Sequence, residues 1–501
     1  MKKNIKKVVI VGGGTAGWIT SSLLVKLLGN SIDITLVESD DIPTVGVGEA
    51  TIPAILTLHQ ALGLDEREFL KETNATMKLG IQFENWRHQG HSYMHTFGYV
   101  GKDFPFCAFS HFWTAAQQKG LADDYWDYSL NYQAARKNKF THLSRLKDAD
   151  MEGLAYAYHF DAGLYAKYLR KFAERLGVVR IEGMVKHVAQ CSQSGDIEAV
   201  HLSNGEVISG DLFVDCSGMR GLLIEQTLNV GYDDWSHWLP NDSAIAGPTA
   251  SLPTLVPYTR SIAQPVGWQW QIPLQHRVGN GYVYSSKFIS DDEARARFLE
   301  NVQGELLADP RLIRFRTGTR RKHWHKNVVS IGLSSGFLEP LESTSIHLIQ
   351  AFALQLVKFF PHHGITDIER DEFNRRTQME MRQVRDFIIL HYVATERRDT
   401  EYWRFCADLD VPDSLRAKID LFRRSGKVFR ENDELFSPVA WQQVLIGQGV
   451  MPEDFHPIVA GLSDQKLKDL LASIKLIVNK YVDAMPEHER YIQSYMESLQ
   501  N

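Results

Sequence analysis

The stretch that most constrains this chain is a short apolar run that leads directly into three glycines near the N-terminus. Residues 8–18 read VVIVGGGTAGW, a GxGxxG pattern between an expected strand and an expected helix at 15–28. Gly12 permits a tight turn, Gly14 permits a ligand to approach the backbone closely, and Gly17 permits close packing of the helix on the strand. The pattern predicts a Rossmann-like unit that holds the pyrophosphate of a dinucleotide at the N-terminus of the helix.

The next segment strengthens this interpretation. Residues 32–37 read IDITLV and predict a second strand, which ends at Glu38. A carboxylate at this distance from the glycines binds a ribose hydroxyl in dinucleotide-binding folds. It favours FAD or NAD over a cofactor with a 2′-phosphate. A GxGxxG pattern alone could be a structural turn, but here strand, glycines, helix, strand and acid follow in order.

Two later strands extend the nucleotide-binding signal along the chain. Residues 211–215 read DLFVD and run into a turn that contains Gly218, and residues 327–332 read NVVSIG and end at Gly332. The first of these resembles the second flavin-contacting motif of monooxygenase-type FAD enzymes. Together they favour a discontinuous FAD module. Because there is no second GxGxxG, we expect no separate NAD(P)H domain.

Composition narrows the class of protein and its location. The 501 residues include 55 basic and 61 acidic side chains, with no basic block interleaved with aromatics, which argues against a nucleic acid partner. No apolar run is long enough to cross a bilayer, so we expect no membrane association. The opening MKKNIKK imitates a signal peptide but gives way to glycines after four apolar residues. Four scattered cysteines without a CxxC pair suit a reducing cytoplasm and argue against zinc.

Three further stretches have both an ordinary and a functional interpretation when the residues are taken alone. In residues 76–86 an apolar alternation places Lys78 on the less apolar face, where a solvated lysine is the ordinary expectation. In residues 267–273 Trp268 and Trp270 share one face of a strand, as core tryptophans do. Residues 343–345 read STS before an amphipathic helix at 346–360, which indicates a helix cap or a small anion site beside Glu342.

A set of motifs resembles the flavin-dependent tryptophan halogenase family, in the right order from residue 8 to beyond residue 450. The motifs are GxGxxG at 12–17, VGVGEATIP at 45–53, Lys78 before FENW at 83–86, WQWQIP at 268–273 and EPLEST at 339–344.

The resemblance implies a reaction and assigns residues to it. FADH2 from a separate reductase, O2 and chloride or bromide would give hypohalous acid, which halogenates an indole-type ring by electrophilic substitution. Lys78 would hold or carry the halogen, as a hydrogen-bonded hypohalous acid or as a haloamine. Glu342 would polarise the halogenating species and accept the ring proton, and the halide would bind at the backbone N–H groups of Thr344 and Ser345.

The resemblance also implies three sets of binding residues. His95 and Phe97 would sandwich the substrate ring, with Trp441 nearby, although a structural turn with one buried aromatic is nearly as good an interpretation of residues 94–98. Trp268 and Trp270 would keep substrate away from the flavin. The cofactor-binding set is Gly12, Gly14, Thr15, Ala16, Gly17, Glu38, Val47, Gly48, Glu49, Ala50, Gly218, Gly332 and Leu338.

Two departures from the tryptophan-specific members bear on halide and substrate. Those members have glycine where this chain has Ser345, so the halide loop is expected to differ in shape or to need a costly backbone angle. They also carry a Tyr-Tyr pair that helps to hold the amino-acid end of tryptophan, whereas residues 440–447 here read AWQQVLIG. We therefore expect indole or a larger indole compound to be a better substrate than free tryptophan.

The expected architecture is an α/β FAD-binding core of the flavin monooxygenase type with an inserted substrate-binding sheet and a helical C-terminal region. Residues 1–360 would form the discontinuous FAD module, with insertions near 60–150 and 232–315, and residues 361–501 would cover the substrate. Helices are predicted at 369–393 and 463–484 from their periodicity. The resemblance also suggests a homodimer. The alternative functions are a flavin-dependent aromatic monooxygenase and a non-catalytic flavin-binding protein.

Overall fold

The chain folds into two compact units, each assembled from three separate segments. The computed structural model describes residues 4–42, 48–147, 149–361 and 363–497. Unit 1 comprises 1–75, 160–242 and 314–382, and unit 2 comprises 76–159, 243–313 and 383–501. Strand β9 (Ala157–Asp161), strand β20 (Arg311–Arg314) and helix α9 (Asp367–Val393) each run from one unit into the other.

The remaining elements of unit 1 are a mixture of strands, helices and short helical turns. They are β1 (Lys7–Val11), α1 (Gly14–Leu28), β2 (Asp33–Glu38), β3 (Gly48–Ala50), α2 (Ala54–Leu62), α3 (Glu66–Thr73), α6 (Ala162–Arg175), β10 (Val179–Glu182), β11 (Val185–Gln190), β12 (Ile197–Leu202), β13 (Val207–Ser209), β14 (Leu212–Asp215), η2 (Gly218–Arg220), η3 (Leu222–Thr227), β15 (Tyr232–Asp234), β21 (Gly318–Arg320), β22 (Trp324–His325), β23 (Val328–Ser330), η4 (Gly332–Ser334), β24 (Gly336–Phe337), η5 (Pro340–Glu342) and α8 (Ser345–Lys358).

The remaining elements of unit 2 are mostly strands in its first two segments and helices in the last. They are β4 (Thr76–Lys78), β5 (Gly80–Glu84), β6 (Ser92–Thr96), α4 (Phe109–Gln118), η1 (Tyr125–Tyr128), α5 (Leu130–Arg136), β7 (Arg145–Leu146), β8 (Met151–Glu152), β16 (Ser243–Thr249), β17 (Thr259–Ala263), β18 (Trp268–Pro273), β19 (Val278–Tyr284), α7 (Asp291–Asn301), α10 (Glu401–Ala407), α11 (Asp413–Ser425), α12 (Pro438–Gly447), α13 (Pro457–Ala460), α14 (Asp464–Asp483) and α15 (His488–Glu497).

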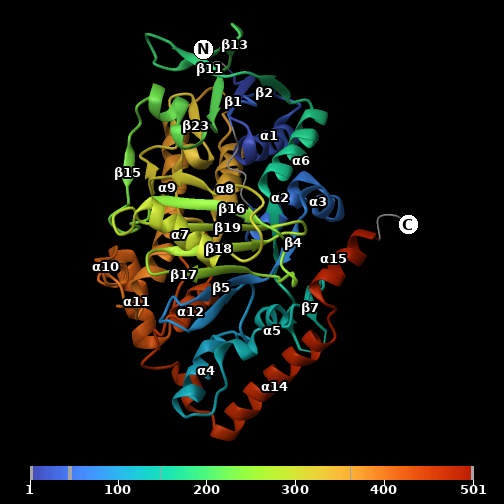
Figure 1. The fold of residues 1–501 in the computed structure, drawn as a ribbon, viewed down its shortest axis with the longest axis vertical. Coiled ribbons are helices and arrows are strands. Elements are labelled where there is room, and N and C mark those ends of the chain that lie inside the picture. Colours follow the sequence, from blue (N-terminus) through green and yellow to red (C-terminus); the bar gives the residue numbers. More distant parts are fainter. Residues whose placement is uncertain (1–3, 43–47, 148, 362, 498–501) are drawn as a thin grey trace. The chain divides into compact units, whose positions relative to one another are not determined.

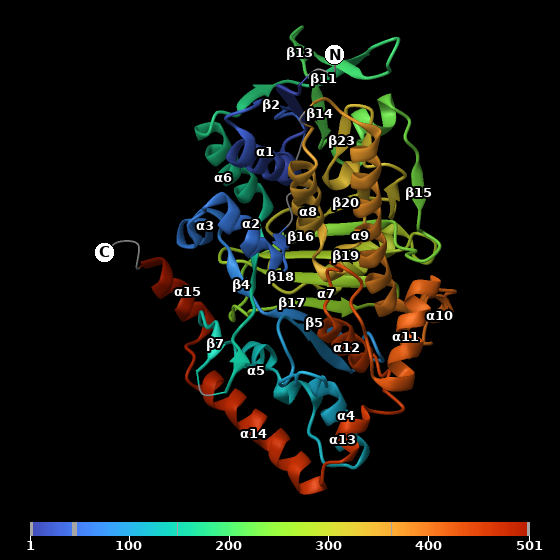
Figure 2. The same ribbon diagram turned by 180° about the vertical axis from the view of Figure 1, so that it is seen from behind.

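Unit 1 is built on a six-stranded sheet in the order β10-β2-β1-β14-β23-β22. The first five strands are parallel, and β22 pairs antiparallel with β23. The predicted strands of the FAD module thus lie side by side, although β14 and β23 come far later in the sequence than β1. The predicted helix after the glycines is α1, which packs against α6 and α8 (Figures 1 and 2).

Both faces of this sheet are covered, which explains the continuous apolar run of β1. Val9 and Val11 pack in one cluster with Val200 of the β11–β13 sheet. Ile10 points to the opposite face, as does its register partner Leu36, and there α1 lies close to Leu36. Parallel strands buried on both faces read as unbroken apolar segments rather than alternating ones.

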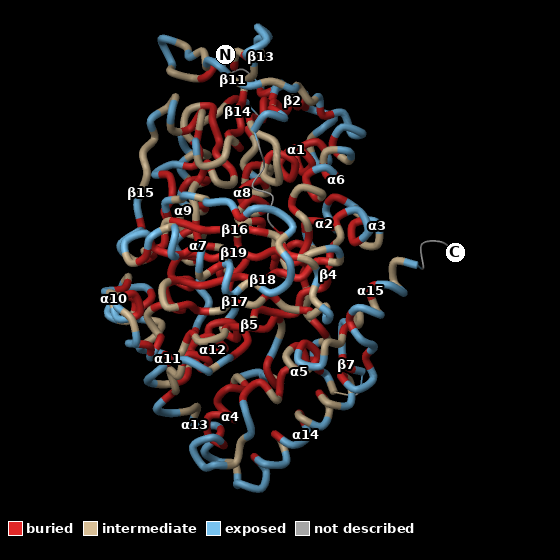
Figure 3. The backbone as a smooth tube through the Cα atoms, in the orientation of Figure 1, coloured by how far each residue is buried: buried red, intermediate tan, exposed pale blue. Residues whose placement is uncertain are grey.

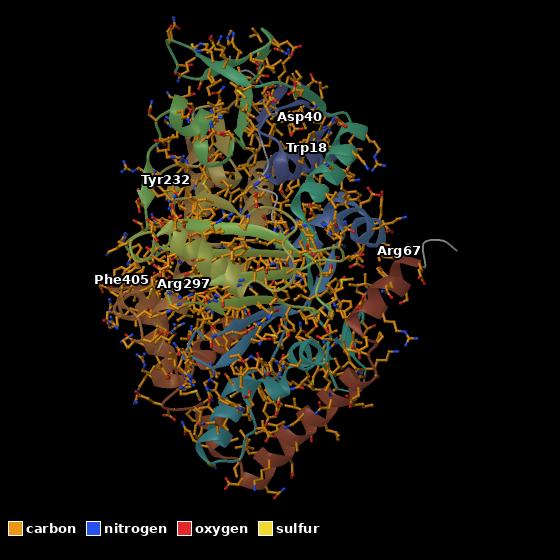
Figure 4. The ribbon with its side chains drawn as sticks, in the orientation of Figure 1. Trp18, Asp40, Arg67, Tyr232, Arg297 and Phe405 are labelled. Carbon is orange, nitrogen blue, oxygen red and sulfur yellow. The ribbon has the colours of Figure 1, made fainter. Side chains whose placement is uncertain are left out.

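The first and last glycines of the fingerprint have the roles that the sequence predicted. Gly12 adopts a left-handed φ of 106° in the turn after β1, and a Cβ atom there would overlap the backbone carbonyl of Cys216 at the end of β14. A Cβ on Gly17 would overlap the carbonyl oxygen of Gly12 and lie 3.3 Å from Leu36 Cδ1. Trp18, which follows it on α1, is buried (Figure 4).

Unit 2 contains a seven-stranded sheet in the order β20-β16-β19-β18-β17-β5-β6. Its strands β16, β18 and β19 are buried almost throughout (Figure 3). On one face α7 packs against β16 and β19, where Phe298 joins a cluster with Ile245 and Tyr282 (Figure 1). The long helix α14 packs against α4 and α5 (Figure 2).

The alternating segment 76–86 forms two strands where the sequence predicted one. β4 pairs antiparallel with β9, whereas β5 pairs with β6 and β17. The break falls at Leu79, whose N–H donates to the carbonyl of Pro257 and whose carbonyl accepts from the N–H of Phe97. Alternation alone does not reveal that consecutive residues change their pairing partners.

The predicted C-terminal helices are confirmed as α9 and α14, whose ends lie within two residues of the expected ones. The division into a flavin module at 1–360 and a substrate-covering region at 361–501 is a functional one, and it stays a prediction. Among the described helices, none combines the length and the apolar character needed to span a bilayer.

Substitution of Gly17 by alanine tests the close packing of α1. The added Cβ would overlap the Gly12 carbonyl, so Gly17→Ala is expected to lower the free energy of unfolding by about 1–3 kcal/mol and to weaken flavin binding. Urea denaturation and flavin titration measure the two effects. Gly461→Ala is the control, because its nearest heavy atom would be 3.8 Å away, and it should stay within about 0.5 kcal/mol of wild type. Equal stability of the two variants would contradict the packing argument.

Candidate active site

The N-terminus of α1 presents unused backbone donors beside the glycine turn. Its N-cap residue is Gly13, which has no side chain to cap the helix, and its first turn carries no acidic residue. The N–H groups of a first helical turn have no partner within the helix, and the helix dipole adds partial positive charge there. Thr15 and Ala16 lie in this turn. This end of α1 therefore suits a phosphate group.

Glu38 lies against the same turn. Its carboxylate occupies the space that a Cβ on Gly13 would need, so the glycine is required for the acid to approach. Arg180 Nε donates to Glu38 Oε1 at 2.6 Å, and both side chains are largely buried. Sequence reasoning missed Arg180, which holds the carboxylate at the glycine turn where a ribose hydroxyl is expected.

The later glycines lie at the carboxyl ends of neighbouring strands in the same sheet. A Cβ on Gly332, after β23, would come within 2.8 Å of the Cβ of Ala16 on α1. Gly218, after β14, has a φ of 72°, and a Cβ there would meet nothing within 4 Å. The buried carboxylate of Asp215 accepts hydrogen bonds from the N–H groups of Leu223 and Ile224 at 2.8 Å and so shapes the turn after β14. Ligands of open α/β sheets bind at such strand ends.

The segment 45–53, which contains four of the predicted cofactor-binding positions, is described in part. Val47 lies outside the described residues, and Gly48, Glu49 and Ala50 form β3. Burial raises the pKa of Glu49 from its ordinary value of 4.5 to about 7. This side chain therefore changes charge near neutral pH.

The EPLEST motif forms a tight turn at the start of α8. Glu342 is buried in the 3-10 turn η5, and the next residue, Ser343, has a left-handed φ of 58°. Ser345 is the first residue of α8 and has helical backbone. The expectation that Ser345 needs a costly backbone angle is therefore wrong, because the left-handed angle falls on Ser343.

The N-terminus of α8 also lacks a side-chain cap. Thr344 is the N-cap residue, and its hydroxyl makes no capping hydrogen bond. The backbone N–H groups at this end of the helix have no side-chain cap, which suits the anion site predicted at Thr344 and Ser345. Before the turn, the buried Glu339 accepts a 3.0 Å hydrogen bond from Asn241 Nδ2, while the preceding residue, Leu338, is buried.

Lys78 is fully buried at the end of β4, so the ordinary expectation of a solvated lysine is wrong. Its Nζ atom lies 5.3 Å from the centroid of the Phe97 ring. A cation over an aromatic face is attracted by the quadrupole of the ring. Two of the predicted residues, one on β4 and one directly after β6, are thereby brought together.

A buried histidine supports the strand that carries Lys78. The ring of His159 is within hydrogen-bond distance of the hydroxyls of Thr76, at 3.0 Å, and Thr259, at 2.9 Å. Burial, together with the nearby Lys78 charge, holds the pKa of His159 well below its ordinary value. The imidazole is therefore neutral and joins β4, β9 and β17 without adding a second positive charge.

His95 belongs to an aromatic cluster that also contains Trp441. The centroid of the His95 ring is 5.6 Å from that of Phe387, which stacks on Phe436 at 3.7 Å. Trp441 on α12 packs edge-on against Phe387 at 4.9 Å. The sequence predicted His95 and Trp441 but missed Phe387 and Phe436, because aromatic residues on helices and loops give no signal of their own.

Trp441 is fixed by a buried ion pair. Its Nε1 donates to Glu434 Oε1 at 3.1 Å, and Lys418 Nζ is 2.6 Å from both oxygens of the same carboxylate. The Lys418 ammonium also lies 4.6 Å from the centroid of the Trp441 ring. Neither charged residue was predicted from the sequence.

The two tryptophans of the WQWQIP motif are buried on β18, with ring centroids 6.2 Å apart. Trp268 packs against Trp86, and the ring of Trp270 covers Gly281 on β19, where a Cβ would overlap it. This packing accounts for their place in the core. Their role in shielding a flavin stays a prediction.

The predicted residues thus fall into two groups, one in each unit. Unit 1 holds the described cofactor positions together with Glu342, Thr344 and Ser345, and unit 2 holds Lys78, His95, Phe97, Trp268, Trp270 and Trp441.

Comparison with known families decides the identity of the chain. The model of the tryptophan halogenase family matches residues 7–464. The chain belongs to this family. It is 36% identical to the tryptophan 7-halogenase RebH of Lentzea aerocolonigenes, over 98% of this chain and 99% of that protein. The resemblance inferred from the motifs is confirmed.

Solved structures agree in fold as well as in sequence. A flavin-dependent halogenase from Xanthomonas campestris is 48% identical, with a TM-score of 0.95 over 98% of this chain and 99% of that one. The flavin-dependent halogenase BrvH of Brevundimonas sp. BAL3 is 42% identical, with a TM-score of 0.94 over the same shares. The predicted fold class is confirmed, and the chain is a flavin-dependent halogenase.

The buried carboxyl of Glu49 predicts a pH-dependent stability of the flavin-free protein. Its pKa is about 7 in the folded chain, against an ordinary value of 4.5, so the unfolded chain loses this proton first as the pH rises. The unfolded chain then binds fewer protons than the folded one, so stability should fall between about pH 4.5 and pH 7. Glu49→Gln removes this contribution. Melting temperatures of both proteins are measured at pH 5.5 and pH 8. Relative to wild type, the melting temperature of the variant should be higher at pH 8 than at pH 5.5. The same difference in melting temperature at both pH values would contradict the prediction.

Proposed function

We propose that this halogenase uses FADH2, O2 and chloride or bromide to halogenate a neutral indole-type substrate, and that Lys78 directs the halogen to the ring. The observation that carries the proposal is the complete burial of the Lys78 ammonium beside the Phe97 ring. Burying a charged group is costly, so a lysine is seldom enclosed in this way without a structural or functional reason. Halogen transfer, the role that the family resemblance implies for this lysine, is the reason we propose.

The residues of unit 1 fit a flavin dinucleotide. The uncapped end of α1 suits the pyrophosphate, and the carboxylate of Glu38 lies at the glycine turn where a ribose hydroxyl would bind. When bound in its reduced form, the flavin supplies the two electrons with which O2 and halide are converted to hypohalous acid. We expect a separate reductase to deliver FADH2, since the sequence contains no second GxGxxG.

We place the halide at the N-terminus of α8. The backbone N–H groups of Thr344 and Ser345 lie at a helix end that has no side-chain cap, and the helix dipole favours a small anion there. The serine in place of glycine is compatible with this site because Ser345 has helical backbone.

The chemical step transfers halogen from oxygen to carbon. A ring carbon of the substrate forms a bond to the halogen of hypohalous acid, the oxygen–halogen bond breaks, and the departing hydroxide and the ring proton together give water. We assign the delivery of the halogen to Lys78, as a hydrogen-bonded hypohalous acid or a haloamine. We assign acceptance of the ring proton to Glu342, with His95, Phe97 and Trp441 around the ring and the tryptophans of β18 between flavin and substrate.

Charge around the aromatic cluster favours a substrate without an ammonium group. The carboxylate of Glu434, which binds Trp441, is already paired with Lys418. The carboxylate of Asp386, next to Phe387 in the chain, accepts from Arg385 at 2.7 Å and from Ser414 at 2.5 Å. These two carboxylates therefore have partners of their own. Free tryptophan would need a new counter-charge for its amino group, whereas indole would not.

Replacement of Lys78 tests the assignment of the lysine. Lys78→Met keeps the length of the buried side chain and removes the amine, so halogenation should fall at least 1,000-fold while flavin binding is unchanged. Product formation with a generic flavin reductase and mass detection measures the loss, and flavin titration checks the fold. Halogenation that survives in the variant would contradict the role of Lys78. Oxygenated products formed without halide would favour the monooxygenase alternative instead.

Parallel assays test the substrate class. Indole and tryptophan are each incubated with chloride or bromide, the reductase and O2, and kcat/KM is measured for each pair. We expect indole to exceed tryptophan by at least 10-fold, because one unpaired buried ammonium costs more than about 1.4 kcal/mol. The preference should be the same with both halides. A higher kcat/KM for tryptophan would contradict the argument from charge.

A further inference from the structure

We propose that Gln443 is a positioning residue for the halogenation reaction, which fixes the end of the strand that carries His95 and leads into Phe97. The inference rests on the proposed function, because it assumes that these two residues hold the substrate ring. Gln443 is completely buried on α12. The hydrogen bonds of its side chain go to Thr96, so its effect on the His95 and Phe97 rings would pass through Thr96.

The amide of Gln443 binds the backbone of Thr96 on both sides. Its Oε1 accepts from the N–H of Thr96 at 3.0 Å, and its Nε2 donates to the Thr96 carbonyl at 3.0 Å. Oε1 also accepts from the Thr96 hydroxyl at 2.8 Å. Within the described part of the chain, all three hydrogen bonds of this side chain go to one residue.

The two hydrogen bonds of Gln443 to the Thr96 backbone take the place of those that a further strand would make at the edge of the sheet. β6 is the last strand of the seven-stranded sheet, and β5 is its neighbour on the other side. Outward N–H and C=O groups on an edge strand need water or another partner, and a buried pair left without one is costly. The Gln443 amide offers one donor and one acceptor at the spacing that a neighbouring peptide would. It therefore fixes the backbone at Thr96 in both position and orientation.

A small shift of Thr96 would affect both the residues proposed to hold the substrate ring and the contact of Phe97 with Lys78. It lies between His95 and Phe97, whose side chains alternate with its own along the chain. The N–H of Phe97 donates to the carbonyl of Leu79 at 2.9 Å, and Leu79 directly follows Lys78. A displaced Thr96 would move the Phe97 ring relative to the Lys78 ammonium, which it now faces at 5.3 Å.

The helix that carries Gln443 is itself anchored to the same strand. A Cβ on Gly447 would overlap the ring of Tyr93 on β6, so α12 and β6 are in close contact at this point. Gln448, just after α12, donates from Nε2 to the carbonyl of His391 at 2.8 Å. Gln448 is as buried as Gln443 and binds a backbone carbonyl of α9, so it provides a matched control.

The test compares Gln443→Met with Gln448→Met. Each removes one buried amide of equal size, but only Gln443→Met frees the backbone of Thr96. The readout is the partition of oxidised halogen between indole and a soluble thioether scavenger, together with the ratio of haloindole isomers. Both ratios are independent of the amount of folded enzyme. We expect Gln443→Met to shift the partition toward the scavenger at least 5-fold and to change the isomer ratio, while Gln448→Met leaves both within 2-fold of wild type.

A second substitution keeps the test decisive if Gln443→Met does not fold. Gln443→Glu retains the acceptor for the N–H and hydroxyl of Thr96 but loses the donor to the Thr96 carbonyl. Its partition of oxidised halogen between indole and scavenger should therefore lie between that of wild type and that of Gln443→Met. Unchanged ratios in the folded Gln443 variants, or an equal shift in Gln448→Met, would overturn the inference. If wild type itself formed no haloindole, the proposed function would fail, whereas normal wild-type activity with unchanged variants would reject the role of Gln443 alone.

Discussion

The arrangement of unit 1 depends on the close approach of strand ends that only glycine permits. Gly12 lies against the carbonyl of Cys216, so the carboxyl ends of β1 and β14 meet without intervening side chains. Gly17 lets α1 lie against the same turn, and Gly332 lets the segment after β23 approach Ala16. The uncapped end of α1, the carboxylate of Glu38 and the turn after β14 are thereby gathered at one edge of the sheet. The proposed flavin site would therefore be a consequence of this backbone packing more than of any single polar side chain.

The second unit depends on a different constraint, which is the burial of charge. Lys78, Glu434 and Arg385 are each enclosed by protein, and each has a specific neighbour. Glu434 and Arg385 are each paired with an opposite charge, and Lys78 lies beside the ring of Phe97 and close to the neutral His159. Buried charges are tolerated only with such specific neighbours, so these contacts hold the residues proposed for halogen transfer and substrate binding in defined positions.

The sequence predicted those features that local patterns encode. The strand–glycine–helix–strand order, the later strands β14 and β23, and the helices α9 and α14 all follow from patterns that are local in the sequence. The burial of Lys78 did not follow, because alternation identifies two faces of a strand but does not say that both are covered. The partners of Trp441 and Thr96 did not follow either. Gln443 and Thr96 are 347 residues apart, and a buried amide in an apolar helix does not reveal which backbone it binds.

The long-range contacts that escaped prediction lie around the residues proposed to bind the substrate. Relatives in the family are named for halogenation at different positions, so family membership alone does not determine where a ring is halogenated. In this chain the segment 440–447 contains Trp441 and two glutamines, and its helix contacts both an aromatic cluster and the edge of a sheet. Since Thr96 connects that helix to Phe97, and Phe97 lies beside Lys78, we expect a change on α12 to alter the geometry of the proposed halogen transfer without changing a residue assigned to catalysis. Substrate choice and the direction of the halogen are therefore expected to vary together when α12 changes.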